Sequence, residues 1–452
     1  MSADRDVVVL GGGLSGLAAA TRLADAGLRV RLLEARGVLG GRTTSFRDPR
    51  TGETIDNGQH AMLGCYRETL AWLDRLGARH TVSEQPSLRL PLVDATGRHL
   101  VLATPDWPAP WHLAAAVARL PGLSLADRLS LARIAPALHR AARAVATGGP
   151  LPCDAEETVA AWLARHGQRG RPLELIWEPL ALAALNQSIG TATAPTFVRV
   201  LGRVFGGSAR EGALVLANRP LAQVFAEPAA RVLQALGAEI VLHAPAQVML
   251  ERGRVTAVSV RGVPRPASRV VLATPWFTWP RALAGDTRPV AGIIDAARLT
   301  RPSPIVTVSL AFDRPAIDTP VVGFPGQWAQ WAFDTSHLAA PGEAAGRRVA
   351  LVVSGADEAL RMEEADVVRK AHAVLTRAGG QAREARLLGS RVLREPRATF
   401  SLAPGQPARP PTRTAAGGLY LASDWVDTGL PATIEGAIEA GRRAAEAVLR
   451  DG

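Results

Sequence analysis

The residues best suited to chemistry lie in a glycine-rich turn near the N-terminus. In this turn Gly11 permits a tight bend, Gly13 lets the backbone approach a pyrophosphate, and Gly16 lets a helix pack closely on a strand. The start of the helix that follows offers free N–H groups and a positive dipole end to phosphates. The sequence of the turn, which ends a β-branched run, is Gly11-Gly12-Gly13-Leu14-Ser15-Gly16.

An acidic residue and a second glycine turn come next. An apolar run, residues 30–33, closes on Glu34, where a carboxylate can accept both ribose hydroxyls of an adenosine. The following Gly40-Gly41-Arg42 resembles the signature of the flavin amine oxidase superfamily, in which the arginine backs the diphosphate. A planar guanidinium suits phosphate oxygens. The pattern favours FAD as the cofactor; the alternative is a surface turn with an exposed arginine.

A second signal lies near the C-terminus. A short apolar strand, residues 418–423, ends in Asp424, and a proline-containing turn leads into a helix. We expect Asp424 to accept hydrogen bonds from ribityl hydroxyls, although it can also be read as a simple helix cap. Pro431 suits a helix start and Thr433 can cap it. The dipole of this helix would stabilise negative charge at the pyrimidine edge of the flavin.

A third signal is the polar cluster Asp56-Asn57-Gly58-Gln59-His60. Its glycine would let backbone approach an isoalloxazine ring, and its neighbours would supply donors and acceptors. A structural histidine remains the other interpretation of His60. Val248, in a strand expected to pass over the adenine, is a further contact. The predicted FAD-binding residues are Gly11, Gly13, Leu14, Ser15, Gly16, Glu34, Ala35, Arg36, Gly41, Arg42, Asn57, Gly58, Gln59, Val248, Asp424, Pro431, Ala432 and Thr433.

Composition indicates a folded protein of two or three domains. The chain has 452 residues, of which 47% are hydrophobic and 21% charged. The net charge is +11, but Lys370 is the single lysine among 52 basic residues, a skew typical of GC-rich codon usage. Since basic blocks interleaved with aromatic residues are missing, we expect no nucleic-acid partner.

Cysteine usage and hydropathy indicate in which cellular compartment the protein is expected. The two cysteines, Cys65 and Cys153, provide neither a disulfide framework nor a metal cluster, and neither lies in a recognisable flavin-attachment motif. We therefore expect non-covalent FAD and no metal. The sequence shows neither a signal peptide nor an uninterrupted apolar run long enough to span a bilayer. The expected location is the cytoplasm.

The predicted fold class is α/β, with a Rossmann-like FAD-binding domain of the two-dinucleotide-binding type and an inserted substrate-binding domain of mixed sheet and helices. The FAD-binding domain is expected at residues 1–80, 205–275 and 385–452, with a hairpin around Arg252-Gly253. The substrate-binding domain is expected at 81–204, mostly helical, and 276–384. We expect strands at 305–312 and 349–353, a helix at 359–378, and an extended loop at 403–414.

At this point the motifs resemble a narrower family. The stretches DNGQH…GCYRETL and DWVDTGLPATIEGAIEAG are similar to the hydroxysqualene dehydroxylase family, the squalene-associated FAD-dependent desaturases of bacterial hopanoid biosynthesis. Carotene desaturases carry a related pattern, which this chain fits with Gly58, His60, Gly64 and Tyr66. The resemblance spans most of the chain.

The resemblance implies reductive loss of an allylic hydroxyl. Hydroxysqualene would ionise with the help of a proton, and reduced FAD would deliver hydride to the allylic cation, giving squalene and water. Candidate proton donors are His60, Asp56, Asp427 and Tyr66. We favour His60, because a carboxylic acid donates near neutral pH only when burial raises its pKa. The residue or protein that reduces the flavin is unknown.

Other functions use the same cofactor. A carotenoid or phytoene-type desaturase would remove hydride with oxidised FAD. A flavin amine oxidase usually carries an aromatic cage and a lysine near the flavin, whereas this chain has Tyr66 and Tyr420 as its two tyrosines and one lysine in a predicted surface helix. A non-catalytic flavoprotein is a third class.

A long-chain isoprenoid substrate is nearly insoluble in water, so we expect the enzyme to take it from a membrane. Between Trp107 and Ala146 lie apolar residues at helical spacing, Trp111, and an excess of arginine. This pattern suits an interfacial helix on anionic lipid at the inner face of the cell membrane. A basic solvated face is the other interpretation.

Overall fold

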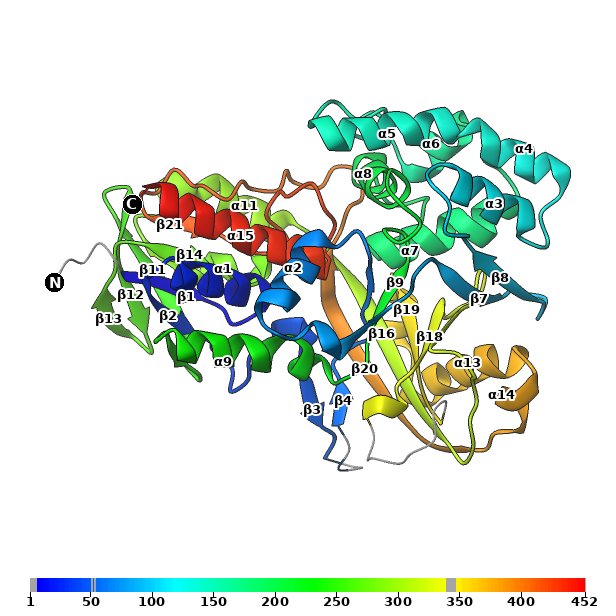
Figure 1. Cartoon of the computed structure of the whole chain (residues 1–452). Coiled ribbons are helices and arrows are strands. Elements are labelled where there is room, and N and C mark those ends of the chain that lie inside the picture. The colour runs from blue at the N-terminus through cyan, green and yellow to red at the C-terminus, as the bar shows by residue number, and fades with distance from the viewer. Residues whose placement is uncertain (1–5, 50–51, 53, 339–346, 452) are drawn as a thin grey trace.

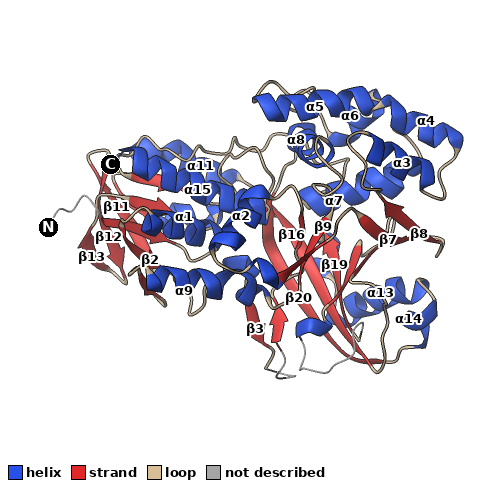
Figure 2. Ribbon diagram, in the orientation of Figure 1, coloured by secondary structure: helices blue, strands red, loops and turns tan. Residues whose placement is uncertain are grey.

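The computed structural model describes residues 6–49, 52, 54–338 and 347–451. Both ends of the described chain lie in one half of the molecule, at left in Figure 1, and long strands reach into the other half. Figure 2 shows sheets within both halves and helices packed around them.

A parallel sheet carries the glycine-rich turn. The side chains of its strands are buried from both faces, with Val9 and Leu32 at 0% exposure, as expected for a covered parallel sheet. Because the carboxyl ends of parallel strands meet at one edge, the sheet brings the glycine turn, Glu34 and Asp424 together. Its five strands, in spatial order, are β10 (Glu239–Val241), β2 (Arg29–Leu33), β1 (Asp6–Leu10), β14 (Val270–Leu272) and β21 (Leu419–Leu421).

Three helices pack together beside this sheet: α1 (Leu14–Asp25), α9 (Glu227–Ala235) and α15 (Ile434–Asp451) (Figure 1). Helices α1 and α15 are so close that a Cβ at Gly441 would lie 2.3 Å from the carbonyl oxygen of Ser15. The glycine therefore allows the C-terminal helix to lie against the first one.

A smaller sheet confirms the predicted hairpin. Arg252 and Gly253 join two antiparallel strands and have φ angles of 47° and 77°, as a tight two-residue hairpin turn requires. The sheet is ordered β13 (Val263–Pro266), β12 (Arg254–Val260), β11 (Ala246–Glu251) and β15 (Leu283–Gly285).

A seven-stranded sheet forms the centre of the other half. Its alternating side chains place Val306 and Val308 in the cluster packed on α13 (Glu364–Arg377), while Ile305 and Thr307 lie on the opposite face, toward a cavity. The order is β20 (Leu387–Phe400), β16 (Pro302–Phe312), β19 (Arg348–Ser354), β18 (Trp331–Asp334), β17 (Val321–Gly323), β7 (Arg89–Val93) and β8 (His99–Ala103).

Several predicted elements of this half are confirmed. The strands expected at 305–312 and 349–353 are β16 and β19, and the helix expected at 359–378 is α12 (Asp357–Arg361) followed by α13. The stretch 403–414 is a loop. Strand β20 lies in the part assigned from sequence to the FAD-binding domain, but its partner is β16. The boundaries of the two domains stay a prediction.

Helices make up most of the segment 81–204, as predicted, but its first part, up to residue 103, forms strands that the sequence analysis did not predict. It begins with β6 (Val82–Glu84), β7 and β8, and the last two form a hairpin that turns at Gly97, with φ +83°. Alternating apolar residues in 89–103 are the strand signal that the helical prediction overlooked.

Helices form the rest of this segment, at upper right in Figure 1. The predicted breaks at 121–122 and 148–150 separate α3 from α4 and α5 from α6. These elements are α3 (Trp111–Arg119), α4 (Leu125–Arg133), α5 (Ala135–Thr147), α6 (Val159–Arg165), the π-helical turn η4 (Leu173–Trp177), α7 (Glu178–Leu185) and α8 (Ala194–Phe205).

Short elements complete the described chain. They are α2 (Arg67–Arg75), α10 (Trp279–Ala282), α11 (Ala291–Leu299), α14 (Gly380–Glu384), β3 (Ser45–Arg47), β4 (Thr54–Asp56), β5 (Ala61–Leu63), β9 (Leu214–Ala217), the π-helical turn η5 (Ala222–Ala226), and the 3-10 turns η2 (Gly41–Thr43), η3 (Arg79–Thr81), η6 (Trp276–Thr278), η7 (Arg288–Val290) and η8 (Ser336–Leu338).

Candidate active site

The glycine-rich turn has the geometry of a phosphate site. Gly11 has φ +108°, and a Cβ at Gly16 would lie 1.9 Å from the Gly11 carbonyl oxygen, so both positions require glycine. A Cβ at Gly13 would meet protein only at 3.9 Å, at Gly41, because this residue borders a cavity. Gly13 is the N-cap of α1 and gives it no side-chain cap. The first N–H groups of the helix are thus available to an anion.

The Glu34 carboxylate is fixed beside this turn. It is 8% exposed, and its two oxygens accept hydrogen bonds from the backbone N–H groups of Gly12, at 2.7 Å, and Arg36, at 2.8 Å. Each carboxylate oxygen retains a further lone pair. The side chain lines the cavity and can therefore still accept ribose hydroxyls there.

An ion pair joins the N-terminal and C-terminal motifs. Arg42 lies 2.8 Å from the carboxylate of Asp424, whose side chain is 4% exposed, and donates a second hydrogen bond to the carbonyl of Ala398 at 2.6 Å. Burial opposes the charge of Arg42, but the carboxylates of Asp424 and Glu395 together outweigh it and raise the pKa. Both charged groups line the cavity at the cofactor motifs.

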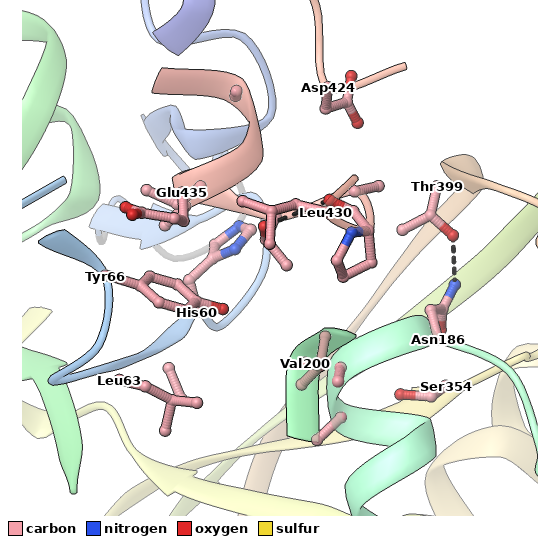
Figure 3. A pocket seen from close by; sticks show the side chains of 18 of the residues that line it. His60, Leu63, Tyr66, Asn186, Val200, Ser354, Thr399, Asp424, Leu430 and Glu435 are labelled. Atoms are coloured by element: carbon pink, nitrogen blue, oxygen red, sulfur yellow. Dashed lines mark hydrogen bonds between the residues drawn. The ribbon is translucent and has the colours of Figure 1, made fainter. Parts of the chain in front are cut away.

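The cavity has a volume of about 2390 Å³ and runs from these loops to an apolar chamber. Leucines of β7, β8 and α7 line the chamber, together with the cavity-facing side of β16 and β19. Figure 3 shows His60, Tyr66 and Glu435 at one side of the site and Asn186 and Ser354 at the other. The predicted residues that line it are Gly11, Gly13, Leu14, Ser15, Glu34, Ala35, Arg36, Gly41, Arg42, Asn57, Gly58, Gln59, His60, Tyr66, Asp424, Pro431, Ala432 and Thr433.

The start of α15 also faces the cavity. The hydroxyl of Thr433 accepts a hydrogen bond from the N–H of Gly436 at 3.1 Å, so the predicted cap is present. Pro431 and Ala432 line the cavity just before the helix. The positive end of the α15 dipole therefore lies at the cavity wall.

Two predicted residues sit behind the cofactor wall instead of lining it. Gly16 serves the packing of α1, as its close approach to Gly11 shows. Val248 is 0% exposed and pairs with Val258 and Leu283 within its sheet. The cavity is lined by the preceding residues 244–247, and the contact of Val248 with the adenine stays a prediction.

The two candidate aspartate donors do not line the cavity. Asp56 is 4% exposed and accepts hydrogen bonds from the Ser45 hydroxyl, at 2.6 Å, and the N–H of Leu221, at 3.0 Å. Burial raises its pKa to about 6, but the side chain ties β3 and β4 to the turn before α9. Asp427 is exposed and pairs with Arg409 at 3.0 Å. Neither is placed to protonate a substrate in the cavity.

His60 and Tyr66 line the cavity, but neither is ready to donate a proton near pH 7. Burial, followed by the charge of Arg42, lowers the pKa of His60 to about 4, so its imidazole is neutral near pH 7. Burial raises the pKa of the Tyr66 hydroxyl above its ordinary value. Both groups can form hydrogen bonds with a ligand while keeping their neutral forms.

Glu435 is a residue that the sequence analysis missed. It is 2% exposed and accepts hydrogen bonds from the N–H groups of Glu68 and Thr69 and from the Thr69 hydroxyl, at 3.1, 2.9 and 2.7 Å. It thus caps α2 from the first turn of α15. Burial raises its pKa, but its oxygens act as acceptors. Its position beside a proline turn was visible in the sequence, whereas its partner helix was not.

Comparisons place this geometry in a family. Residues 14–449 match the family described as flavin containing amine oxidoreductase. The chain is 30% identical to a hydroxysqualene dehydroxylase of Sinorhizobium fredii and 28% identical to one of Rhodopseudomonas palustris, covering 99% of each and of itself. It is 25% identical to a 15-cis-phytoene desaturase of an Oncidium hybrid cultivar over 99% of this chain and 78% of the relative.

Solved structures are similar over almost the whole chain. A cyclohexylamine oxidase from Brevibacterium oxydans has a TM-score of 0.74 at 17% identity, and a putrescine oxidase has 0.74 at 18%, each covering 99% of both chains. These similarities confirm the predicted α/β fold with its FAD-binding domain. The chain therefore belongs to the flavin containing amine oxidoreductase family, with hydroxysqualene dehydroxylases among its relatives, and it is an FAD-dependent oxidoreductase.

Proposed function

We propose that this enzyme removes the allylic hydroxyl of hydroxysqualene reductively and releases squalene and water, as a step of hopanoid and squalene biosynthesis. The observation that carries the proposal is one cavity of about 2390 Å³ that joins the FAD motifs to a chamber walled by leucines. A flexible C30 chain fits such a chamber, and its one polar group would lie near the cofactor. The two dehydroxylase relatives that match this chain over 99% of their length support the same substrate.

The protein would contribute binding, a dry site and electrostatics. Bound FAD, when reduced, supplies hydride. The uncapped start of α1 and Arg42 suit the diphosphate, and the start of α15 favours negative charge on the flavin. The apolar walls exclude water, which would otherwise trap an allylic cation.

Non-covalent attachment of FAD is also supported. Cys65 borders the cavity, and burial raises the pKa of its thiol to about 12. Because the thiolate is the reactive form, this cysteine would stay inert toward the flavin.

The cavity opening suggests where the substrate enters. The cavity is lined by exposed residues of α3 and α5, among them Trp111, which is 64% exposed. Trp107, in the loop before α3, is 47% exposed, and Leu125 and Leu129, on α4, are 73% and 55% exposed. The same helices carry four exposed arginines: Arg119, Arg133, Arg140 and Arg143. We infer peripheral contact with an anionic membrane from this arrangement.

The described residues hold no helix long and apolar enough to cross a bilayer. Contact at the surface would let the substrate pass from the lipid to the chamber without entering water. The inner face of the cell membrane is the surface we propose.

A phytoene-type desaturase is the second candidate, favoured by the phytoene desaturase that matches 99% of this chain. It would use the same apolar cavity and oxidised FAD. An amine oxidase is less well supported, because Lys370 lies on α13 paired with Glu358 at 2.7 Å and Tyr420 bonds Asp451 at 2.8 Å, neither of them lining the cavity.

One anaerobic experiment separates the candidates. Photoreduced holoenzyme is mixed with hydroxysqualene, flavin reoxidation is followed by absorbance, and squalene is measured by mass spectrometry. We expect one squalene for each flavin reoxidised. Oxidised enzyme mixed with phytoene should remain oxidised; reduction of the flavin by phytoene, with no reaction of hydroxysqualene, would assign a desaturase instead.

A further inference from the structure

A second cavity, polar where the first is apolar, lies next to the substrate chamber. Its volume is about 710 Å³, and it reaches solvent at the exposed residues Arg301 and Asp357. The polar side chains that line it are those of Glu178, Gln187, Ser188, Thr191, Arg301, Ser303, Gln327, Gln330, Ser354, Asp357 and Ser401. We call it the polar side cavity. It offers water a place that the leucine-lined chamber does not.

Helix α7 and the end of β19 form the wall between the two cavities. Among the described residues, three line both cavities: Pro179, Leu182 and Ser354. Of these, Ser354 carries the polar side chain. Its hydroxyl is therefore the point in this wall at which a hydrogen bond can connect the two spaces.

The sheet register places Ser354 close to the cofactor end of the chamber. It pairs with Ile305 on β16, and the next pair along the same face is Thr307 with Val352. All four residues line the main cavity. The hydroxyl oxygen of Thr307 lies 3.9 Å from the position of a Cβ on Gly58, in the polar cluster expected at the flavin. Ser354 is thus one cross-strand pair away from that loop.

The wall is held rigidly around Ser354. Its backbone N–H donates to the Gln330 side chain at 2.8 Å. The Asn186 amide next to it donates to the Thr399 hydroxyl at 3.1 Å, drawn in Figure 3, and accepts from the N–H of Gly355 at 2.9 Å. These hydrogen bonds hold the backbone that carries Ser354, from which its hydroxyl can bond a substrate group.

Glu178 lines the polar side cavity from the first residue of α7. One of its oxygens accepts a hydrogen bond from the N–H of Ile189 at 3.0 Å. Burial raises its pKa, against the effect of that hydrogen bond. The other charged groups that line this cavity are Arg301 and Asp357. Glu174 lies against Gly326 in the cavity wall and pairs with Arg171 at 2.9 Å.

We propose that the polar side cavity delivers the proton for dehydroxylation and takes up the water released, with Ser354 bonding the substrate hydroxyl and Glu178 holding the proton. This rests on the proposed function. The carboxylic acid of Glu178 gives its proton, through water in the side cavity and the Ser354 hydroxyl, to the leaving oxygen. The C–O bond breaks with its electron pair on oxygen, and water leaves. Reduced FAD, when bound, would supply the hydride that converts the allylic cation to squalene. Glu178 regains a proton from solvent.

The chain offers a matched control for Glu178. Both Glu178 and Glu227 follow a π-helical turn, begin a helix and precede a proline, but Glu227 is exposed on α9 and lines neither cavity. Flavin reoxidation by hydroxysqualene is measured anaerobically with reduced holoenzyme. We expect Glu178→Gln and Ser354→Ala to slow it about 10²- to 10⁴-fold, the scale of general acid catalysis, and Glu227→Gln to leave it unchanged. Glu178→Asp should recover part of the rate.

Two further measurements separate proton supply from a structural role. In the wild type the reoxidation rate should fall as pH rises through the Glu178 pKa, and Glu178→Gln should remove that dependence. Infrared spectra should show a carboxylic acid C=O band that titrates above the ordinary glutamate range and is absent in Glu178→Gln. Wild-type rates and pH profiles in both variants would overturn this inference alone. A wild type that fails to react with hydroxysqualene would overturn the proposed function as well.

Discussion

The guanidinium of Arg42 and the carboxylate of Asp424 lie 2.8 Å apart, although one follows the second strand of the chain and the other follows β21. Parallel strands deliver both residues to the same edge of the sheet. The ion pair therefore connects the N-terminal and C-terminal cofactor motifs. It also orients the two groups that we expect to contact the diphosphate and the ribityl chain.

Removing one member of this pair should weaken both folding and cofactor binding. In Arg42→Met the Asp424 carboxylate loses its partner while it stays buried, which costs about 1–3 kcal/mol. We expect a drop of that size in the urea unfolding free energy of the apoprotein, and FAD binding at least about tenfold weaker by flavin fluorescence. Arg22→Met is the control, since its partner Glu446 is at the surface and such pairs contribute about 0–1 kcal/mol. Equal effects of the two substitutions would contradict the prediction.

Replacing Gly13 should impair FAD binding, whereas replacing Gly16 should impair folding. In Gly13→Ala the added Cβ meets no protein atom closer than 3.9 Å, so the variant should fold with wild-type stability but lose FAD, because the methyl group enters the diphosphate space. In Gly16→Ala the Cβ would lie 1.9 Å from the Gly11 oxygen, and we expect about 1–3 kcal/mol of destabilisation. Thermal melts of the apoproteins and flavin absorbance after purification distinguish these outcomes. A Gly13→Ala protein that keeps its full flavin content would refute the assignment.

The cofactor loops could be predicted because their signals are local. Gly11, Glu34 and Arg42 sit in one strand–turn–helix–strand unit, so spacing alone determines where they meet. The C-terminal motif was recognisable for the same reason. The direct contact between Arg42 and Asp424 could not be predicted from spacing, because it forms only when the parallel sheet brings the two motifs together.

The residues that were misjudged depend on partners distant in sequence. Asp56 resembled a catalytic acid, but its carboxylate accepts hydrogen bonds from Ser45 and Leu221. Glu435 was overlooked because it caps a helix formed by residues 67–75. The chamber wall at β7 and β8 was missed because the insertion was expected to be mostly helical. The polar side cavity is likewise lined by segments distant in sequence, among them the start of α7 and the end of β19.

The lowered pKa of His60 should make the apoprotein less stable at acidic pH. Its pKa is about 4 in the folded protein and 6.5 as an unperturbed side chain, so between these values the unfolded chain binds more protons. Stability should therefore fall by about 1–3 kcal/mol as pH drops from 6.5 to 4, and His60→Gln should remove that loss. Asp56 acts in the opposite direction, because its folded pKa of about 6 lies above 3.8. Urea unfolding at several pH values, with Asp56→Asn measured alongside, tests both signs.

The same variant tests catalysis. A neutral His60 is a hydrogen-bond partner and no proton source, so we expect His60→Gln to slow flavin reoxidation by less than about tenfold and to leave its pH profile in place. A loss of about 10²-fold or more, with a changed pH profile, would return the role of general acid to His60.

Membrane contact should depend on two exposed tryptophans, Trp111 at the cavity and Trp107 in the loop before α3. Vesicles of phosphatidylglycerol should bind the holoenzyme at low salt, because Arg119 lies over the Trp107 ring at 5.4 Å and Arg133 and Arg140 are exposed on the two following helices. Binding should weaken at high salt, where these charges are screened. Burying a large apolar side chain contributes about 1.5–3 kcal/mol, so Trp107→Ser with Trp111→Ser should weaken binding at least about tenfold. Leu299→Ser is the control, since Leu299 is 69% exposed on α11 and does not line the cavity. Sedimentation measures the bound fraction, and wild-type protein that stays in the supernatant at low salt would mean that substrate reaches the chamber from a partner enzyme.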